Sequence, residues 1–310
     1  MLKLNERAWN LVENLLKNEQ NLRIKSYRSK RGALLIDAGV EVEGSLEAGV
    51  LISRMLLSDL GKVNLFLSDE FMYVQVRTDY PLLACMASQY AGWKISVGKF
   101  YGMGSGPARV LYGKEPVLKK FGWKGKEDRA VLFIETRVVP PEDVVEYVSE
   151  SCKVFPDKIA VVFAPTGSLV GSVQVPARVV ETGVHKMIEL GYEVERLSSA
   201  IGAAPVPPVG TDDFEAIGRT NDAVIYGGKI VYFVRDERDL FSLVSRIPSL
   251  TSRDYGLPFL EVFRLNDCDF YKIDPLLFSP AEVSLVSLLT GRTFRAGLIN
   301  RDILRRSFGL

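Results

Sequence analysis

The chain has 310 residues, of which 47% are hydrophobic and 25% charged, the proportions of an ordinary globular protein with one large or two modest domains. Its 39 Lys and Arg residues face 38 Asp and Glu residues, which excludes a polybasic nucleic-acid binder and, with the high apolar content, a mainly disordered chain. Three widely spaced cysteines and a single histidine, His185, argue against a disulfide framework, a zinc site and a histidine-dependent triad, unless His185 itself is the base.

Cysteine usage and the N-terminal residues predict a cytoplasmic protein. The three cysteines lack the paired spacing of secreted domains, which indicates a reducing compartment. Residues 1–6 lack the apolar core of a signal peptide, and no run approaches the ~18 apolar residues that would span a bilayer. We therefore expect neither a targeting segment nor a membrane segment.

Residues 1–128 are predicted to form an N-terminal α/β domain. Its clearest element is a first helix with one apolar face, made by Ala8, Leu11, Val12, Leu15 and Leu16. A second helix is capped by Ser45 and ends near Gly61, and a third begins at Pro81 and ends near Gly92. The strands expected here cover 22–27, 33–37, 63–67, 71–77, 94–97 and 108–112.

Residues 129–310 are predicted to form a second α/β domain, after the polar stretch 114–129. Strands over 130–135, 159–164 and 192–197 alternate with helices over 141–152 and 176–190, which is typical of βαβ units. Two hairpins are expected further on, one around Gly227-Gly228 and one around Thr290-Gly291. The fold class is therefore mixed α/β, with some antiparallel pairs.

A glycine-rich run over 102–109 is the first candidate site. Successive backbone N–H groups in a glycine turn can cradle an anion, and Ser105, Lys94, Lys99 and Arg109 would add a hydroxyl and positive charge. The run matches neither the dinucleotide fingerprint nor the P-loop spacing. A tight turn between two strands is the commoner explanation.

The second candidate is the segment 165–183, which starts where a predicted strand ends. Arg178 and Glu181 are three residues apart and share one helix face. They form either an ordinary surface ion pair or a carboxylate that exchanges protons beside a fixed cation. The spacing alone favours the surface pair. His185, one turn later, is expected to be a partly buried helix residue.

The third candidate is the segment 212–222, which holds four acidic residues. Magnesium is a conceivable ligand, but the spacing matches no EF-hand, and a capped helix explains the acids better. The run 219–221, Arg-Thr-Asn, is instead expected to contact a ligand.

Several motifs in order resemble the methenyltetrahydromethanopterin cyclohydrolase family. They cover essentially the whole chain: 101–109 (YGMGSGPAR), 164–166 (APT), 171–174 (GSVQ), 177–183 (ARVVETG), 215–222 (EAIGRTND), 254–256 (DYG), 258–259 (PF), 269–275 (DFYKIDP) and 307–310 (SFGL). Several of these motifs are six or more residues long, so chance similarity does not explain them.

The resemblance implies a two-domain mixed α/β fold with a substrate cleft between the domains. It implies a cytoplasmic homotrimer of archaeal-type one-carbon metabolism, acting on a small-molecule pterin, with neither nucleic acid nor membrane as a partner. It also implies that the enzyme uses no metal and no redox cofactor. The implied reaction is reversible hydrolysis of the 5,10-methenyltetrahydromethanopterin cation to 5-formyltetrahydromethanopterin.

Carried over by these motifs, Glu181 would be the general acid and base, and Arg178 would position it or tune its pKa. The implied substrate-binding residues are Lys94, Ser105, Arg109, Thr166, Gln174, Arg219 and Asn221. An aromatic residue is usual in the family where this chain has His185, so we expect the pH profile of the activity to differ from that of the family.

Two other functions fit the same residues. One is a related amidine or pterin hydrolase that prefers a folate-type substrate, which turnover of the two methenyl compounds distinguishes. The other is a pterin-binding or carrier protein without catalysis, which predicts tight binding without turnover.

Overall fold

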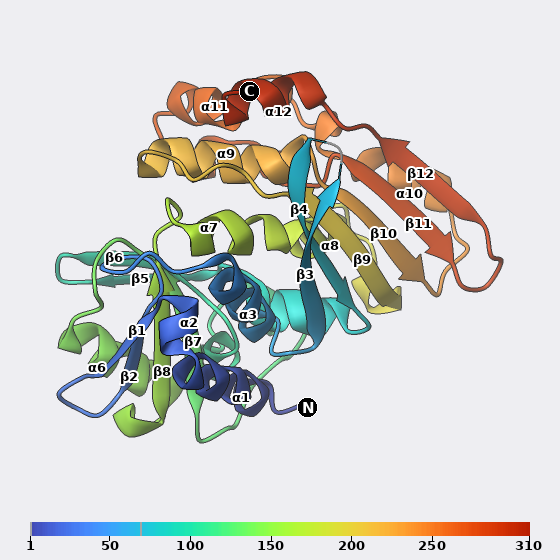
Figure 1. Ribbon diagram of the computed structural model, residues 1–310. Helices are drawn as coiled ribbons and strands as arrows, with labels where there is room; N and C mark the ends of the chain where they lie inside the picture. The colour runs from blue at the N-terminus through green and yellow to red at the C-terminus, as the bar shows by residue number, and fades with distance from the viewer. Residues whose placement is uncertain (1, 69) are drawn as a thin grey trace. The chain divides into compact units, whose positions relative to one another are not determined.

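The computed structural model describes residues 2–68 and 70–310, and the chain divides into two compact units (Figure 1). Unit 1 comprises Met1–Gly61 and Leu83–Gly171, and unit 2 comprises Lys62–Leu82 and Ser172–Leu310. This division differs from the predicted one at 128/129. The strands just after residue 129 pair with strands from earlier in the chain, and the segment Lys62–Leu82 contributes strands to the sheet of unit 2.

Unit 1 is built around a mixed sheet of six strands among the described residues. In spatial order these are β1 (Lys25–Arg28), β2 (Leu34–Asp37), β8 (Ile159–Ala164), β7 (Ala130–Glu135), β6 (Phe100–Ser105) and β5 (Trp93–Val97). The three central strands β2, β8 and β7 are parallel, and the outer pairs are antiparallel. The predicted βαβ unit is confirmed, since helix α6 (Glu142–Cys152) connects the parallel neighbours β7 and β8.

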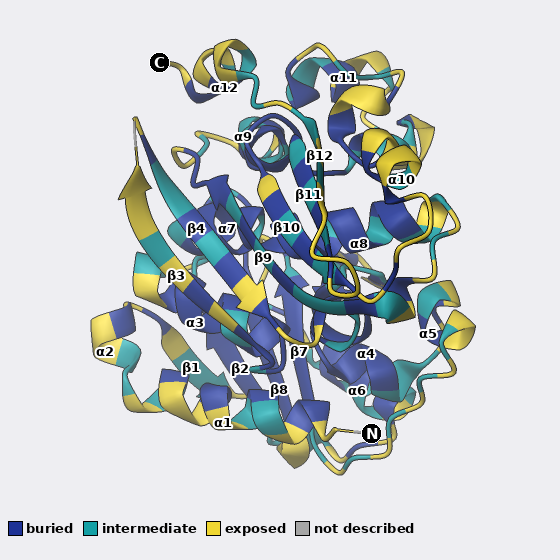
Figure 2. Cartoon of the chain, turned by 90° about the vertical axis from the view of Figure 1, so that its right-hand side faces the viewer, coloured by how far each residue is buried: buried dark blue, intermediate teal, exposed yellow. Residues whose placement is uncertain are grey.

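Helices cover both faces of this sheet. Val131 and Phe133 of β7 pack with α1 (Leu4–Lys17) and α3 (Leu46–Leu56), while Leu132 and Ile134 pack with α6 on the opposite face. A strand buried on both faces is apolar at nearly every position, and all residues of β7 and β8 except the half-buried Glu135 at the end of β7 are buried (Figure 2). The other short helices connected with unit 1 are α2 (Glu19–Leu22), the π-helix η1 (Leu82–Gln89), α4 (Ala108–Tyr112), α5 (Pro116–Lys120), the 3₁₀ turn η2 (Pro156–Lys158) and α7 (Leu169–Gln174), which runs into unit 2.

The expected glycine turn and the strand over 108–112 are both wrong. Gly102 and Gly104 lie inside strand β6, and residues 108–112 form helix α4. A Cβ at Gly102 would lie 2.5 Å from Ile134 Cγ2, and one at Gly104 would lie 3.0 Å from Trp93 O, so the glycines allow close strand packing. Because β6 pairs with both β5 and β7, this stretch forms sheet hydrogen bonds rather than an anion cradle.

Arg109 is completely buried at the start of α4. Its Nε donates to Glu115 Oε1 at 2.8 Å and its Nη2 to Glu115 Oε2 at 2.5 Å. Its Nη1 donates to the carbonyl oxygens of Met86 and Ser88, at 3.2 and 3.1 Å. The guanidinium also lies over the Tyr90 ring, 5.2 Å from its centroid. This bidentate pair connects η1 to the segment before α5.

Unit 2 contains the second mixed sheet, with six strands in the described part of the chain. Their order is β12 (Thr293–Gly297), β11 (Glu282–Ser287), β10 (Lys229–Val234), β9 (Leu197–Pro205), β4 (Phe71–Thr78) and β3 (Gly61–Ser68). The hairpin predicted around Gly291 is confirmed by the antiparallel pair β11 and β12. The hairpin predicted around Gly227-Gly228 is wrong, because residues up to Ile225 belong to helix α9 (Asp213–Ile225).

The helices of unit 2 fall into two groups. Helix α8 (Val179–Glu189) contacts β9 and β10, and α10 (Leu240–Arg246) contacts β11 and β12. Helices α11 (Phe259–Leu265) and α12 (Arg301–Phe308) pack against α9 around an aromatic core. The 3₁₀ turns are η3 (Pro176–Arg178), η4 (Val194–Arg196), η5 (Ser249–Thr251), η6 (Phe270–Lys272) and η7 (Pro275–Leu277). The strand predicted over 192–197 is wrong, since η4 occupies residues 194–196 and strand β9 begins only at Leu197.

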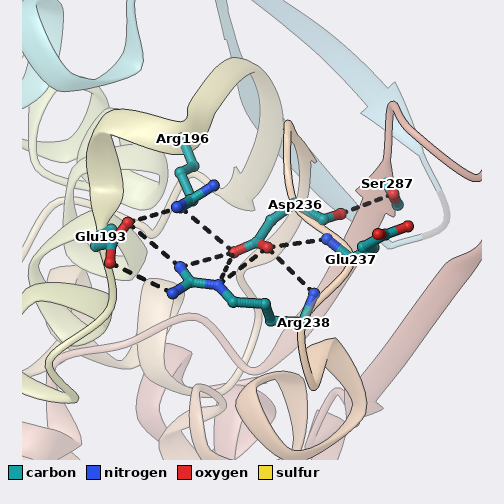
Figure 3. Close-up of polar contacts among 6 residues, drawn as sticks. All are labelled: Glu193, Arg196, Asp236, Glu237, Arg238 and Ser287. Carbon is teal, nitrogen blue, oxygen red and sulfur yellow. Dashed lines mark hydrogen bonds and ion pairs between the residues drawn. The ribbon is translucent and has the colours of Figure 1, made fainter.

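A polar network holds three connections together at one edge of this sheet (Figure 3). Asp236, which follows β10, accepts a hydrogen bond from Arg238 Nη2 at 3.1 Å, and its backbone carbonyl accepts one from Ser287 Oγ at 2.7 Å. Arg196, just before β9, donates to Glu193 at 2.7 Å and lies 3.7 Å from Asp236. Burial opposes ionisation of Asp236, but hydrogen bonds from Arg238 hold the pKa of this carboxyl below its ordinary value.

Buried Asp222 ties α9 to both of its neighbouring helices. Its Oδ1 accepts from the backbone N–H of Phe259, at the start of α11, at 2.8 Å, and its Oδ2 accepts from Ser307 Oγ of α12 at 2.6 Å. Burial raises the pKa of this carboxyl to about 7. The two hydrogen bonds oppose this shift, and the nearby negative charge of Glu261 adds to it. The helix is capped by Asp212, whose side chain accepts from Glu215 N, as the capped-helix interpretation of this segment predicted.

No helix in the described ranges is long and apolar enough to cross a membrane.

The buried Arg109–Glu115 pair yields a stability prediction. Glu115→Gln keeps the shape of the side chain but leaves the Arg109 guanidinium without a counter-charge. We expect the free energy of unfolding to fall by about 3–5 kcal/mol, measured by guanidinium denaturation. The control is Asp267→Asn, which removes the exposed pair between Asp267 and Lys272 and should leave the unfolding midpoint unchanged. Equal midpoints for the two variants would contradict the prediction.

Asp222 predicts a specific pH dependence of stability. The unfolded chain loses this proton near the ordinary pKa of 3.8, whereas the folded chain keeps it until about pH 7. The folded state therefore binds more protons between these values, and stability falls as the pH rises through the window. Asp222→Asn can keep both hydrogen bonds without a charge, so its stability relative to wild type should rise by on the order of 4 kcal/mol from pH 4 to pH 8.

Denaturant unfolding at several pH values measures this difference. Asp302→Asn, an exposed acid on α12, is the matched control and should follow the wild-type curve. If Asp222→Asn also follows the wild-type curve, the titration assigned to Asp222 is wrong.

Candidate functional site

Arg178 and Glu181 lie together at the start of helix α8 in unit 2. Pro176 begins the 3₁₀ turn η3, and Arg178 is the residue at which this turn passes into α8. Arg178 Nη1 lies 3.7 Å from Glu181 Oε2, and the two side chains are only 10% and 8% exposed. The pair is therefore mostly shielded from water, unlike the surface pair that the spacing alone favoured.

Gln174 holds the other side of the Arg178 guanidinium. It is the last residue of α7, it is completely buried, and its Oε1 accepts from Arg178 Nη2 at 3.0 Å. Three of the residues that the resemblance implied are thus brought together within unit 2 by a helix, a 3₁₀ turn and the next helix. The guanidinium is oriented by Gln174 on one side and by the carboxylate on the other.

This arrangement suits proton transfer beside a fixed positive charge. A carboxylate can take a proton from an attacking water and return it to a leaving group, provided that it is held in one geometry. A guanidinium beside it can stabilise negative charge that develops on an oxygen. Low exposure strengthens both effects, because little water screens the charges.

Arg219 and Asn221 make their described contacts inside unit 2. Arg219 Nε donates to the Ser307 carbonyl at 3.1 Å and its Nη1 to the Val209 carbonyl at 3.1 Å, and Nη2 pairs with Glu215 at 2.6 Å. Asn221 Nδ2 donates to Ile217 O, one turn earlier in α9, at 2.8 Å. Arg219 thus fixes α9 to the C-terminal helix α12, while α9 itself packs against η3.

Sequence reasoning missed the role of Asp222. It lies one turn after Arg219 on α9, and both side chains bond to Ser307, one through the serine hydroxyl and one through the carbonyl. The pattern that signals this role is an Arg and an Asp three residues apart in a helix that also buries apolar residues. By sequence alone, this acid belongs with those of the capped helix start.

Four of the implied substrate-binding residues lie in unit 1. Thr166 Oγ1 donates to Glu135 Oε1. Glu135 ends β7 and Thr166 follows its parallel neighbour β8, so both lie at the carboxyl ends of these strands, where α/β proteins commonly bind ligands. Ser105 is buried at the end of β6. Lys94 is exposed on β5 at the edge of the sheet, with its amine 5.6 Å from the Tyr101 ring centroid. Arg109 is the buried partner of Glu115 described above.

Glu135 is a further polar residue that the sequence analysis did not single out. It ends a strand that was predicted correctly, so its position at the carboxyl edge of the parallel strands was available from the sequence.

His185 lies on α8, one turn after Glu181, as expected for a partly buried helix residue. Its Nε2 is 3.8 Å from Glu189 Oε1 and its side chain is 23% exposed. Among residues 2–68 and 70–310, no three His, Cys, Asp or Glu side chains are grouped so that they could hold a metal ion.

Comparison with known proteins gives a consistent result. The model of the family described as Cyclohydrolase (MCH) matches residues 3–308. A protein of Methanococcoides burtonii named methenyltetrahydromethanopterin cyclohydrolase is 42% identical, over 100% of this chain and 99% of its own length. Proteins with the same name are 43% identical in Xanthobacter autotrophicus, over 96% of this chain and 90% of the relative, and 41% identical in Methanothermobacter marburgensis, over 100% of both.

These matches extend over both units and over the Gln174–Arg178–Glu181 group. The chain therefore belongs to the cyclohydrolase (MCH) family.

Proposed function

We propose that this protein is a methenyltetrahydromethanopterin cyclohydrolase and that Glu181 is its general acid and base. The family membership and the names of the relatives support the reaction. The observation that carries the catalytic assignment is the shielded group in which Gln174 and Glu181 lie on two sides of the Arg178 guanidinium. The substrate is the 5,10-methenyl cation and the product is 5-formyltetrahydromethanopterin.

In the proposed reaction, the oxygen of a water molecule bonds to the amidinium carbon while Glu181 takes one of the two water protons. The resulting adduct is neutral. Glu181 then returns its proton to the leaving nitrogen as the bond between that nitrogen and the carbon breaks. The hydroxyl of the adduct loses its proton to solvent and becomes the formyl carbonyl, so that hydrolysis consumes one water and releases one proton.

Arg178 has two roles in this proposal. It keeps Glu181 in one place, because Gln174 fixes the far side of the guanidinium. Its positive charge beside Glu181 would also stabilise negative charge that develops on the oxygen of the adduct. Because the methenyl substrate is already a cation, the carbon is electrophilic without a Lewis acid, and we propose that no metal is needed.

The remaining assignments have different support. Lys94 carries an exposed amine at a sheet edge, which suits contact with an anionic tail of the substrate. Thr166 lies at the carboxyl edge of parallel strands, where a ligand is expected. The described contacts of Arg109 and Arg219 are internal, so we do not assign them to the tail. The homotrimer and the cytoplasmic location stay predictions from the resemblance.

Loss of the methenyl absorbance on adding the protein tests the proposed reaction. We expect rapid loss with the methanopterin substrate, slower loss with the folate analogue, and the same rate after treatment with EDTA. Preference for folate would favour the related hydrolase, and binding without any loss would favour the carrier protein. A rate that collapses in EDTA and recovers with added metal would contradict the metal-free mechanism.

Glu181→Gln tests the catalytic assignment. The amide keeps the shape but cannot exchange the proton, so kcat should fall by about 10²–10⁴-fold with little change in KM or in melting temperature. Glu189→Gln, on the same helix but exposed, is the control and should keep wild-type kcat. A Glu181→Gln enzyme with near-normal kcat would show that another group transfers the proton.

A further inference from the structure

Tyr232 reaches the backbone beside Glu181 from the neighbouring sheet. Its side chain projects from strand β10, is completely buried, and donates a hydrogen bond from Oη to the Val180 carbonyl at 2.7 Å. Val180 precedes Glu181 and lies two residues after Arg178. The hydroxyl therefore bonds to the one helical turn that carries both members of the ion pair.

Gly183 makes this contact possible. A Cβ at position 183 would lie 2.2 Å from Tyr232 Oη, closer than any real side chain approaches, so another residue there would displace the tyrosine or the helix. Two more glycines, Gly202 and Gly228, allow Val179 to approach the sheet, since a Cβ at either would lie 3.1 Å from a Val179 methyl group. We call Tyr232 and these three glycines the α8 seat.

The physical effect of the seat is to fix the first turn of α8. A helical carbonyl already accepts from the N–H four residues later, so the hydroxyl adds a second, lateral hydrogen bond that sets the tilt and rotation of the turn. A buried hydroxyl is costly unless it is bonded, which makes an alternative position of the turn unfavourable. Because Arg178 and Glu181 start from this turn, their mutual geometry depends on where the turn lies.

We propose that Tyr232 is a positioning residue for the Arg178–Glu181 pair, acting through the Val180 carbonyl, and that Gly183 is its steric counterpart. The inference rests on the proposed function for its effect on turnover. Tyr232 is assigned no contact with substrate. Displacement of a catalytic group by about 1 Å costs on the order of 10²-fold in rate, so the loss of one hydroxyl has a measurable effect here.

Tyr232→Phe removes only the hydroxyl, and Tyr226→Phe is its matched control. Tyr226 is also buried in unit 2, and its hydroxyl also donates to a backbone carbonyl, that of Leu257, at 2.6 Å. We expect both variants to lose a similar amount of thermal stability. Tyr232→Phe should lower kcat at least tenfold with KM within twofold of wild type, whereas Tyr226→Phe should keep kcat. Equal kcat for the two variants would overturn the proposal.

Hydrogen–deuterium exchange of the full chain without substrate gives a readout independent of activity. The peptide covering residues 176–186 should exchange faster in Tyr232→Phe than in wild type or Tyr226→Phe. Unchanged exchange would show that the hydroxyl does not fix the turn and would overturn the proposal. If wild type fails to turn over the methenyl cation, the proposed function fails, and the exchange result alone decides the role of the hydroxyl.

Gly183→Ala tests the steric half of the proposal. The new methyl group meets the hydroxyl oxygen at 2.2 Å but the ring carbon behind it at 3.1 Å, so Tyr232→Phe should relieve much of the clash. We expect Gly183→Ala to lower the melting temperature and kcat, and the double variant to melt higher than Gly183→Ala alone. Strictly additive losses would overturn the assignment of Gly183 as the steric counterpart of Tyr232.

Discussion

The close approach of α8 to the sheet of unit 2 is the constraint on which the candidate site depends. The beginning of the helix is fixed by the α8 seat, in which glycines replace side chains that would otherwise hold the helix away. Further along, buried Lys186 donates to Thr251 Oγ1 at 3.2 Å and to the Leu276 carbonyl, and burial lowers the pKa of its ammonium to about 8. The network around Asp236 then holds the connection after the helix (Figure 3). A helix fixed at these points can keep a buried ion pair in one geometry.

The same types of polar residue link helices to one another and bind ligands. Arg219 and Asp222 both have partners within the protein, which include the carbonyl and the hydroxyl of Ser307, near the end of the chain. A buried polar group requires a partner, and neither residue type nor spacing tells whether the partner is a substrate or a distant carbonyl. The same holds for Arg109, whose bidentate partner, Glu115, lies six residues away.

The parts of the fold that could be predicted are those with a local cause. Strands β7 and β8 begin and end as predicted, because burial on both faces makes every residue apolar except Glu135 at the end of β7. The glycines of β6 led to the wrong prediction of a turn. They allow β6 to pack closely against Ile134 and Trp93 of the neighbouring strands, and these contacts are not visible in the local sequence. The division into units escaped prediction for the same reason, because β4 pairs with β9 across more than a hundred residues. At the site, spacing placed Arg178 and Glu181 on one helix face, but their burial depends on tertiary packing.

The proposed mechanism also explains why a paired guanidinium suits a cationic substrate. An unpaired Arg178 would repel the methenyl cation, whereas the Arg178–Glu181 pair is neutral as a whole. In the proposed mechanism, the substrate loses its positive charge on addition of water at the moment at which Glu181 becomes protonated. The total charge of the pair and the substrate therefore stays at one positive charge throughout the addition. Within this total, charge is redistributed only over the short distance of a proton transfer. Such a step requires little reorganisation of its surroundings, so a rigid site suits it better than a solvated one. The chemistry of the substrate thus requires a rigid site, and the fixation of α8 provides one.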